Sequence, residues 1–331
     1  MTLRVTDETY RDGPQSLWAN RLRTKDMLPA VPHTAAAGFR RSNLLSGVGF
    51  EVAITFLEED PLRRFRLLQS MLGETPSTVL VRSRNLFGWT RYSDDVVTFC
   101  LEHLASMGLR EFEVFDALND TRNIEHHIRE GARLGLHTSA CLTFAESPVH
   151  TDEYLAGKAK ELASYGASSI LLSDACGVMR PERVGPLFAA IRSAAPGVDL
   201  EFNAHDQTGL ALACYREALR AGVTALSSAA RPFAGSNSVP ATADVIGVAD
   251  ELGIPVDLDR DQVAWIDRYF DYVAYAYGKP RRHHVDFDEA SYQSYVTHQI
   301  PGGMMSHYVG QLESLGLLDR LPEVLEEAGR V

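Results

Sequence analysis

The segment LRVTDETYRDGPQS, residues 3–16, begins with a short run of apolar and β-branched residues and then turns abruptly to ionisable ones. Arg11, Asp12 and Gln15 place a cation, a carboxylate and an amide within five residues of one another, just after that run. This combination suits the binding of a small anionic oxo acid beside a metal ion. The alternative interpretation is a polar turn built on the DGP triplet.

Composition limits the class of protein. The chain has 331 residues, 45% of them hydrophobic and 23% charged, enough for one large domain with a small appendage. No apolar run approaches the ~20 residues of a membrane helix, and the N-terminus has no signal-peptide pattern. Four scattered cysteines favour a reducing cytoplasm. A net charge of −12 without a basic cluster argues against nucleic acid as a partner.

Short β-rich runs alternate with helical periodicity along the first two thirds of the chain, which is typical of parallel βα units. Eight such runs and no GxGxxG, GxxxxGK[ST] or GxSxG motif favour a closed (β/α)8 TIM barrel of the α/β class over a doubly wound sheet. The predicted strands are Leu3–Thr6, Arg40–Leu45, Thr78–Val81, Glu111–Phe115, His137–Leu142, Ser169–Leu172, Asp199–Asn203 and Ala225–Ser228.

After residue 256 the pattern changes to helices without intervening strands. We therefore predict a barrel domain over residues 1–256 and a helical C-terminal extension over residues 257–331. Its aromatic residues at helical spacing, Trp265, Tyr269 and Tyr272, predict helix packing and a dimer contact, so we expect a homo-oligomer. His283 and His284 are expected in an exposed linker, because nothing around them repeats a metal-ligand spacing. The predicted helices are Asp261–Tyr277, Glu289–Gln299, Met305–Leu315 and Leu321–Ala328.

The active site of such a barrel lies at the carboxyl ends of its strands. Glu201, Asn203 and His205 alternate along one predicted strand and should face the interior, with His205 nearest the mouth. His205 and Asp12 are candidate metal ligands, the alternative for His205 being a polar loop residue. Arg82 ends an apolar strand, and we favour carboxylate binding there over a surface salt bridge.

With these residues in place the chain resembles the carboxyltransferase domains of biotin-dependent enzymes, namely pyruvate carboxylase, oxaloacetate decarboxylase alpha subunit and transcarboxylase. It is more remotely similar to metal-dependent HMG-CoA lyase-like barrels. The likeness covers nearly the whole chain. It rests on RDGPQS (11–16), RSRNLFGW (82–89), FDALND (115–120), SPVHT (147–151), HDQTG (205–209), PFAG (232–235) and HQIPGGM (298–304).

The resemblance implies a barrel, a divalent metal ion and a 2-oxo acid such as pyruvate or oxaloacetate. By resemblance, Asp12 matches the aspartate metal ligand and His205 one of two histidine ligands. Arg82 matches the arginine that holds the substrate carboxylate, and Arg11 and Gln15 match residues that flank the reacting carbonyl.

The chain also departs from that pattern. The carboxylated lysine of the family falls on Ser173, the first histidine of its H-x-H pair on Asn203, the acidic residue of its second strand on Asn43 and its proton-shuttling threonine on Asn237. With Asn203 as an amide ligand, magnesium or manganese suits the site better than zinc, or the site is empty. Glu201 is a candidate to replace the lost negative charge.

These residues predict a carboxyltransferase-like or decarboxylase-like enzyme that acts on a 2-oxo acid through an enolate, with Arg11, Gln15 and Asn237 at the reacting centre. Two alternatives stay open: an aldolase or acyl-transfer enzyme of the HMG-CoA lyase type, and a catalytically degenerate barrel that serves as a binding subunit. The sequence has no AMKM-like biotinylation motif and ends where the family continues toward its biotin-carrying region. We therefore expect no biotin on this chain and a separate carrier or subunit as partner.

Overall fold

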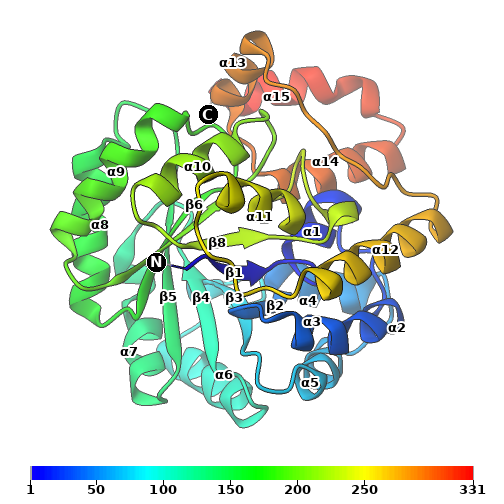
Figure 1. The fold of residues 1–331 in the computed structure, drawn as a ribbon, viewed down its shortest axis with the longest axis horizontal. Coiled ribbons are helices and arrows are strands. Elements are labelled where there is room, and N and C mark those ends of the chain that lie inside the picture. The colour runs from blue at the N-terminus through cyan, green and yellow to red at the C-terminus, as the bar shows by residue number, and fades with distance from the viewer. Residues whose placement is uncertain (1, 331) are drawn as a thin grey trace.

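Eight parallel strands close into a barrel in sequence order in the computed structural model, which describes residues 2–330 (Figure 1). Each strand pairs with the next one in the chain, and β1 closes the barrel by pairing with β8. The strands are β1 (Arg4–Asp7), β2 (Arg41–Ser46), β3 (Ser77–Arg82), β4 (Glu111–Phe115), β5 (His137–Thr143), β6 (Ser169–Asp174), β7 (Asp199–Ala204) and β8 (Ala225–Ser228).

Helices surround the strands as a ring in Figure 1, as expected for a (β/α)8 barrel. None of the helices in residues 2–330 is long and apolar enough to cross a membrane. The helices of the barrel are α1 (Asp12–Trp18), α2 (Thr24–Met27), η1 (Leu28–Ala30), α3 (Val31–Ala37), α4 (Gly47–Thr55), α5 (Pro61–Met71), η2 (Ser83–Asn85), α6 (Asp94–Ser106), η3 (Thr121–Asn123), α7 (Glu125–Arg133), α8 (Asp152–Tyr165), α9 (Pro181–Ala194), α10 (Ala211–Arg220), η4 (Arg231–Phe233) and α11 (Thr242–Glu251).

The predicted fold class is confirmed, and every predicted strand is present. Strands β4 and β8 have the predicted bounds, and no other strand end differs by more than two residues. The largest difference is at β6, which runs on to Asp174 because its register with β7 continues through Ser173 and Asp174. The polar residues at the strand ends are therefore partly in the sheet and partly in the loops that follow it.

The C-terminal extension is helical, as predicted, and contains α12 (Arg260–Ala276), α13 (Glu289–His298), α14 (Gly302–Ser314), η5 (Leu318–Arg320) and α15 (Leu321–Arg330). Helix α12 packs on α3, whereas α14 packs on α1 at the carboxyl ends of the strands. Figure 1 shows α13, α14 and α15 together on one side of the barrel. The division at residues 256 and 257 remains a prediction.

The linker between α12 and α13 corrects one expectation. His284 is exposed, but His283 is only half exposed, and burial lowers the pKa of its imidazole. The backbone at Gly235 has a positive φ and passes so close to the carbonyl oxygen of His283 that a Cβ would clash there. The linker is therefore partly packed against the loop that follows β8, because that loop lacks a side chain at Gly235.

His127 on α7 predicts a pH dependence of the fold. Its side chain is fully buried, and neither ring nitrogen has a hydrogen-bond partner among residues 2–330. Burial lowers the pKa of His127 to about 4. Since the unfolded chain takes up this proton near pH 6.5, the free energy of unfolding should fall as pH decreases from 6.5 toward 4, by up to about 3 kcal/mol.

The measurement is urea unfolding of the unaltered chain and of His127→Phe between pH 7 and pH 4. The variant should lose less stability on acidification, whereas His103→Gln, at an exposed histidine on α6, should behave like the unaltered chain. Equal acid sensitivity in His127→Phe would contradict this assignment.

Candidate active site

Asp12 and His205 meet at the mouth of the barrel. Asp12 opens α1 shortly after β1, and His205 follows β7, where its backbone N–H donates to the carbonyl oxygen of Asp174. The two side chains are buried, and Asp12 Oδ2 lies 2.9 Å from His205 Nε2. Asp12 Oδ2 nevertheless has no hydrogen-bond partner of good geometry within residues 2–330. The two atoms are therefore close without being aimed at one another.

Arg11 lies beside this pair. Its Nη1 is 2.8 Å from Asp12 Oδ1, and its Nη2 is 2.8 Å from Glu8 Oε2 and 3.7 Å from Glu113 Oε2. Burial alone would raise the pKa of Asp12, but the charges of His205 and Arg11 outweigh it and lower that pKa to about 2. Asp12 is therefore an ionised carboxylate with one oxygen held by Arg11 and the other facing His205.

The interior of the barrel is ionic from its base to its mouth. Arg41 on β2 is 1% exposed, and its guanidinium lies 3.0 Å from Glu113 and 2.7 Å from Glu201. Asn43 continues the chain of contacts, since its Nδ2 is 3.0 Å from Glu113 and 3.4 Å from Glu8. We call this set the ionic column; its members are Glu8, Arg11, Asp12, Arg41, Asn43, Glu113 and Glu201.

The column holds more negative than positive charge. Two guanidinium groups face four carboxylates, and every one of these side chains is more than nine-tenths buried. Arg40 and Glu111 add one charge of each sign at the base. Burial raises the pKa of Glu8 and of Glu113 despite the nearby guanidinium groups. The carboxylates therefore outnumber the guanidinium groups by two, and protons, the His205 imidazole or a divalent cation would compensate for the excess negative charge.

A divalent cation fits the residues that are present. An unpartnered buried oxygen of Asp12 and Nε2 of His205 are 2.9 Å apart, and two neighbouring ligands at about 2.1 Å from an octahedral ion would be separated by about 3 Å. Asn203 lies two residues before His205 on β7 and shares its face. No group of three His, Cys, Asp or Glu side chains suited to a metal occurs in residues 2–330, and Asn203 is the neighbouring residue that could add an amide oxygen. Such a site favours a hard cation.

Glu201 is not at the mouth, which corrects the expectation that it replaces the negative charge missing there. Its carboxylate is held at the base by Arg41 and Arg40, and it accepts hydrogen bonds from Ser139 and Ser169. Burial would raise the pKa of Glu201, but the two arginines lower it to about 2. The carboxylates closest to Arg11 are instead Glu8, Asp12 and, farther away, Glu113.

Arg82 ends β3 outside the ionic column. Its guanidinium lies 4.2 Å from the ring centroid of Trp89, and its Nη1 donates to the carbonyl oxygen of Gly88 at 3.4 Å. Trp89 Nε1 donates in turn to Glu51 at 2.6 Å. Burial lowers the pKa of Arg82, and the charge of Glu51 offsets part of that shift. No ion pair within 4 Å is formed by this guanidinium within residues 2–330. It is therefore a cation available to an anionic ligand.

Gln15 and Asn237 lie where the C-terminal extension meets the barrel. Gln15 Oε1 accepts a hydrogen bond from Ser46 at 2.7 Å, and a Cβ at Gly303 would come within 3.0 Å of Gln15 Nε2. Asn237 Nδ2 lies 3.4 Å from Ser306 Oγ. Both side chains are predicted site residues, but their contact with the C-terminal extension was not predicted. The HQIPGGM segment with its paired glycines was the available signal for it.

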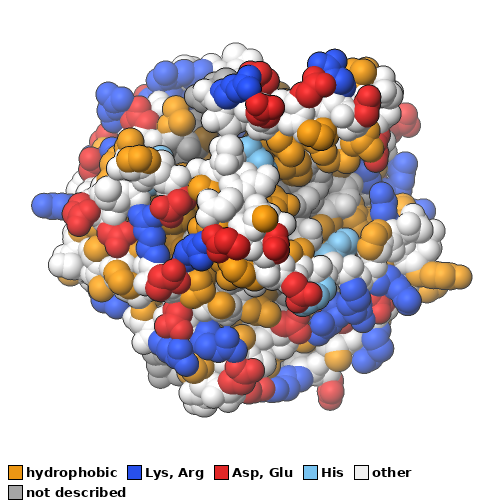
Figure 2. Space-filling model, turned by 90° about the horizontal axis from the view of Figure 1, so that it is seen from above, with side chains coloured by type: hydrophobic (Ala, Val, Ile, Leu, Met, Phe, Trp, Pro, Cys, Tyr) orange, Lys and Arg blue, Asp and Glu red, His pale blue; other side chains and the backbone are white. Residues whose placement is uncertain are grey.

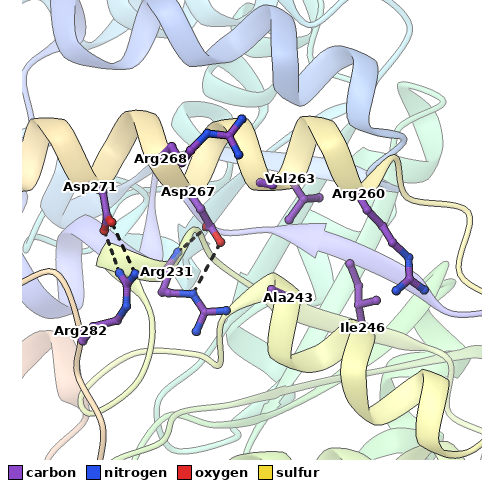
Figure 3. A pocket seen from close by; sticks show the side chains of 10 residues that line it. Arg231, Ala243, Ile246, Arg260, Val263, Asp267, Arg268, Asp271 and Arg282 are labelled. Carbon is purple, nitrogen blue, oxygen red and sulfur yellow. Dashed lines mark hydrogen bonds and ion pairs between the residues drawn. The ribbon is translucent and has the colours of Figure 1, made fainter.

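The surface charge and a second cleft are also informative. Figure 2 shows acidic and basic side chains mixed over the face that it views, with no area of a single sign. A cleft of about 370 Å³ lies between α11 and α12 (Figure 3). Its Arg231 pairs with Asp267 and Asp244, and its Arg282 with Asp271. None of the residues that line the cleft belongs to the candidate site.

Comparison with known proteins identifies the class to which this barrel belongs. The HMGL-like family model matches residues 103–267, and the model described as conserved carboxylase domain matches residues 296–331. A pyruvate carboxylase subunit of Methanocaldococcus jannaschii is 32% identical over 99% of this chain and 57% of its own length. The 2-oxoglutarate carboxylase large subunit of Hydrogenobacter thermophilus is 32% identical over 99% of this chain and 50% of its own length.

A solved structure supports membership of the same class of proteins. The carboxyl transferase domain from Rhizobium etli pyruvate carboxylase, with oxamate and biotin, matches with a TM-score of 0.90 and 28% identity, over 99% of this chain and 56% of that one. The chain thus belongs to the family of carboxyltransferase domains of pyruvate carboxylase and its relatives. It spans about half the length of the proteins that it matches.

Arg41 should be essential to the stability of this site. Arg41→Met leaves Glu113 and Glu201 buried without their main counter-charge, so we expect a loss of about 3–5 kcal/mol in the free energy of unfolding. Urea unfolding measures it. Arg40→Met is the matched control, because that partly exposed guanidinium shares Glu201 with Arg41 and should cost less. Similar losses in the two variants would show that the column does not depend on Arg41.

Proposed function

We propose that this chain is a carboxyltransferase component that adds a carboxyl group to, or removes one from, a 2-oxo acid of the pyruvate or oxaloacetate type. The observation that carries the proposal is the Asp12–His205 pair beside Arg11. One oxygen of Asp12 accepts no hydrogen bond of good geometry within residues 2–330, and carboxylates outnumber guanidinium groups around the pair. The named relatives act on two different 2-oxo acids, pyruvate and 2-oxoglutarate, which supports this substrate class without choosing its member.

The substrate is held and polarised by residues of this chain. Arg82 binds the carboxylate by charge-assisted hydrogen bonds, for which its guanidinium has no competing ion pair. Arg11 stabilises negative charge that develops on the carbonyl oxygen when a proton leaves the neighbouring carbon. The electron pair left on the enolate then forms the new carbon–carbon bond to the carboxyl carbon as the bond between that carbon and the carrier breaks, and the carrier takes up the proton in its place; decarboxylation is the reverse. The amide of Gln15 orients the carbonyl group.

Asp12 and His205, with Asn203 as a weaker third ligand, would hold a divalent cation, magnesium or manganese rather than zinc. When bound, the cation acts as a Lewis acid on the carbonyl oxygen. An amide ligand and the serine at position 173 make this a weak site, so chelators should remove the metal readily. Asn237 has no titratable group, so its role is hydrogen bonding and the proton is moved by another group.

A carboxyl carrier is the proposed partner. The two curated relatives named above are each described as one subunit of a carboxylase, which implies enzymes assembled from more than one chain. We propose that the carrier supplies or accepts the carboxyl group at the mouth of the barrel.

Two alternatives are each supported by one observation. The HMGL-like match over residues 103–267 supports an enzyme that cleaves or forms a carbon–carbon bond with an aldehyde or acyl group. Ser173, Asn203 and Asn237 support a barrel that binds its ligand without catalysis, because none of the three side chains can act as a base at neutral pH.

Deuterium exchange at the methyl group of pyruvate tests the proposal without a carrier. With Mg²⁺ or Mn²⁺ present, NMR should show exchange catalysed by the unaltered chain, because enolate formation removes that proton. Arg82→Ala should abolish exchange and weaken pyruvate or oxalate binding by about tenfold or more, with little loss of stability.

Arg84→Ala is the matched control, since Arg84 is already paired with Asp94 and should leave ligand affinity unchanged. Unaltered affinity in Arg82→Ala would remove Arg82 from the site. Ligand binding by the unaltered chain without any exchange would favour the noncatalytic barrel.

The changed residues on β6 and β7 predict the metal chemistry. Ser173 is the register partner of Asn203, so side chains introduced at these two positions lie next to each other. Ser173→Lys combined with Asn203→His should raise zinc affinity well above that of the unaltered chain, as measured by chelator competition. Mass spectrometry should find no CO2 adduct on any lysine of the unaltered chain.

Asn203→His alone serves as the control and should raise zinc affinity less than the double substitution. Unchanged zinc affinity in the double variant would show that positions 173 and 203 do not face the metal. The assignment of the β6 and β7 residues would then be wrong.

A further inference from the structure

Glu8 is a buried carboxylate with a fixed position. It directly follows β1, and its backbone N–H donates to the carbonyl oxygen of Ser228 at 2.8 Å. Its side chain is 1% exposed, and Oε2 lies 2.8 Å from Arg11 Nη2. Asn43 Nδ2 lies 3.4 Å from its other oxygen. The carboxylate therefore lies beside Arg11 as its ion-pair partner, although Oε2 accepts no hydrogen bond of good geometry within residues 2–330. Burial raises the pKa of Glu8, and the charge of Arg11 opposes that rise.

Arg11 competes with a cation for Asp12. One oxygen of Asp12 is already 2.8 Å from Arg11 Nη1, and only the other faces His205. An arginine without a second counter-charge would draw the Asp12 carboxylate toward itself and would also repel a cation bound at Asp12. The guanidinium therefore needs a second carboxylate if Asp12 is to serve a metal ion.

We infer that Glu8 is a positioning residue that neutralises Arg11 and thereby leaves Asp12 available to a divalent cation. The inference rests on the proposed function, because it takes the cation at Asp12 and His205 as given. Glu8 is the carboxylate suited to this role, since the next nearest one, Glu113, lies 3.7 Å from Arg11 and is held by Arg41.

Asn43 lies between Glu8 and the neighbouring carboxylate of Glu113. Its amide donates to Glu113 at 3.0 Å and also faces Glu8, so it separates two carboxylates that would otherwise repel each other. Asn43 Oδ1 has no hydrogen-bond partner within residues 2–330. The neutral side chain at this position therefore lets Glu8 remain beside Arg11.

Charge and shape at position 8 can be separated by two substitutions. Glu8→Gln keeps the shape but removes the charge, whereas Glu8→Asp keeps the charge on a shorter side chain. Binding of Mn²⁺ alone, measured by electron paramagnetic resonance of the free ion, should weaken about tenfold in Glu8→Gln and much less in Glu8→Asp. A role in packing alone predicts the opposite order and would overturn the inference.

A double substitution completes the test. Glu8→Gln with Arg11→Met removes both the competing guanidinium and its counter-charge, so Mn²⁺ affinity should return to within about threefold of the unaltered chain. If Glu8→Gln alone does not fold, the double variant still decides, because weak Mn²⁺ binding by that variant in folded form overturns the inference.

Glu59→Gln is the matched control. That carboxylate pairs with Arg64 at 2.6 Å outside the barrel interior, so its loss should leave Mn²⁺ affinity unchanged. Equal Mn²⁺ binding by the unaltered chain and Glu8→Gln overturns the role of Glu8 and leaves the proposed cation intact. No Mn²⁺ binding by the unaltered chain overturns both.

Discussion

Arg41 is the residue on which the interior of this barrel depends. A guanidinium that is 1% exposed can remain charged only if carboxylates compensate for its lost hydration, and Glu113 and Glu201 do so at 3.0 and 2.7 Å. Barrel interiors are more commonly filled by branched apolar side chains. Here ion pairs occupy that space, so the strands that carry these three residues, β2, β4 and β7, are tied to one another across the barrel.

The same column sets the electrostatics of the candidate site. Glu113 contacts Arg41 on one side and lies 3.7 Å from Arg11 on the other. The carboxylate of Glu113 therefore stabilises Arg41 at the base of the barrel and also helps to fix the position of Arg11 at its mouth. Arg11 in turn holds one oxygen of Asp12. The geometry of the candidate metal ligand thus follows from contacts that begin at the opposite end of the barrel.

The fold was predictable because alternating strand and helix patterns are local. Asp12, His205 and Arg82 could also be chosen as candidate site residues, because residues at strand ends can be recognised once the strands are counted. Arg41 and Glu113 were not, because only the closed barrel shows that charges on separate strands converge. Glu8 was missed for a related reason: within a polar run after a strand, the sequence does not tell which side chain turns inward.

The Arg11–Asp12 pair and Arg82, the two parts of the candidate site, are held in place by different contacts. Arg11 and Asp12 are fixed by buried ion pairs, whereas Arg82 is held by stacking on Trp89 and a hydrogen bond to a carbonyl oxygen. The departures at Ser173 and Asn203 lie on β6 and β7, and neither side chain is among the ion-pair partners of Arg11 and Asp12 or the contacts of Arg82 named above. Changes at those two positions can therefore weaken the proposed donor set for a metal while Arg11 and Arg82, the cationic groups proposed to bind and polarise a 2-oxo acid, keep their supporting contacts.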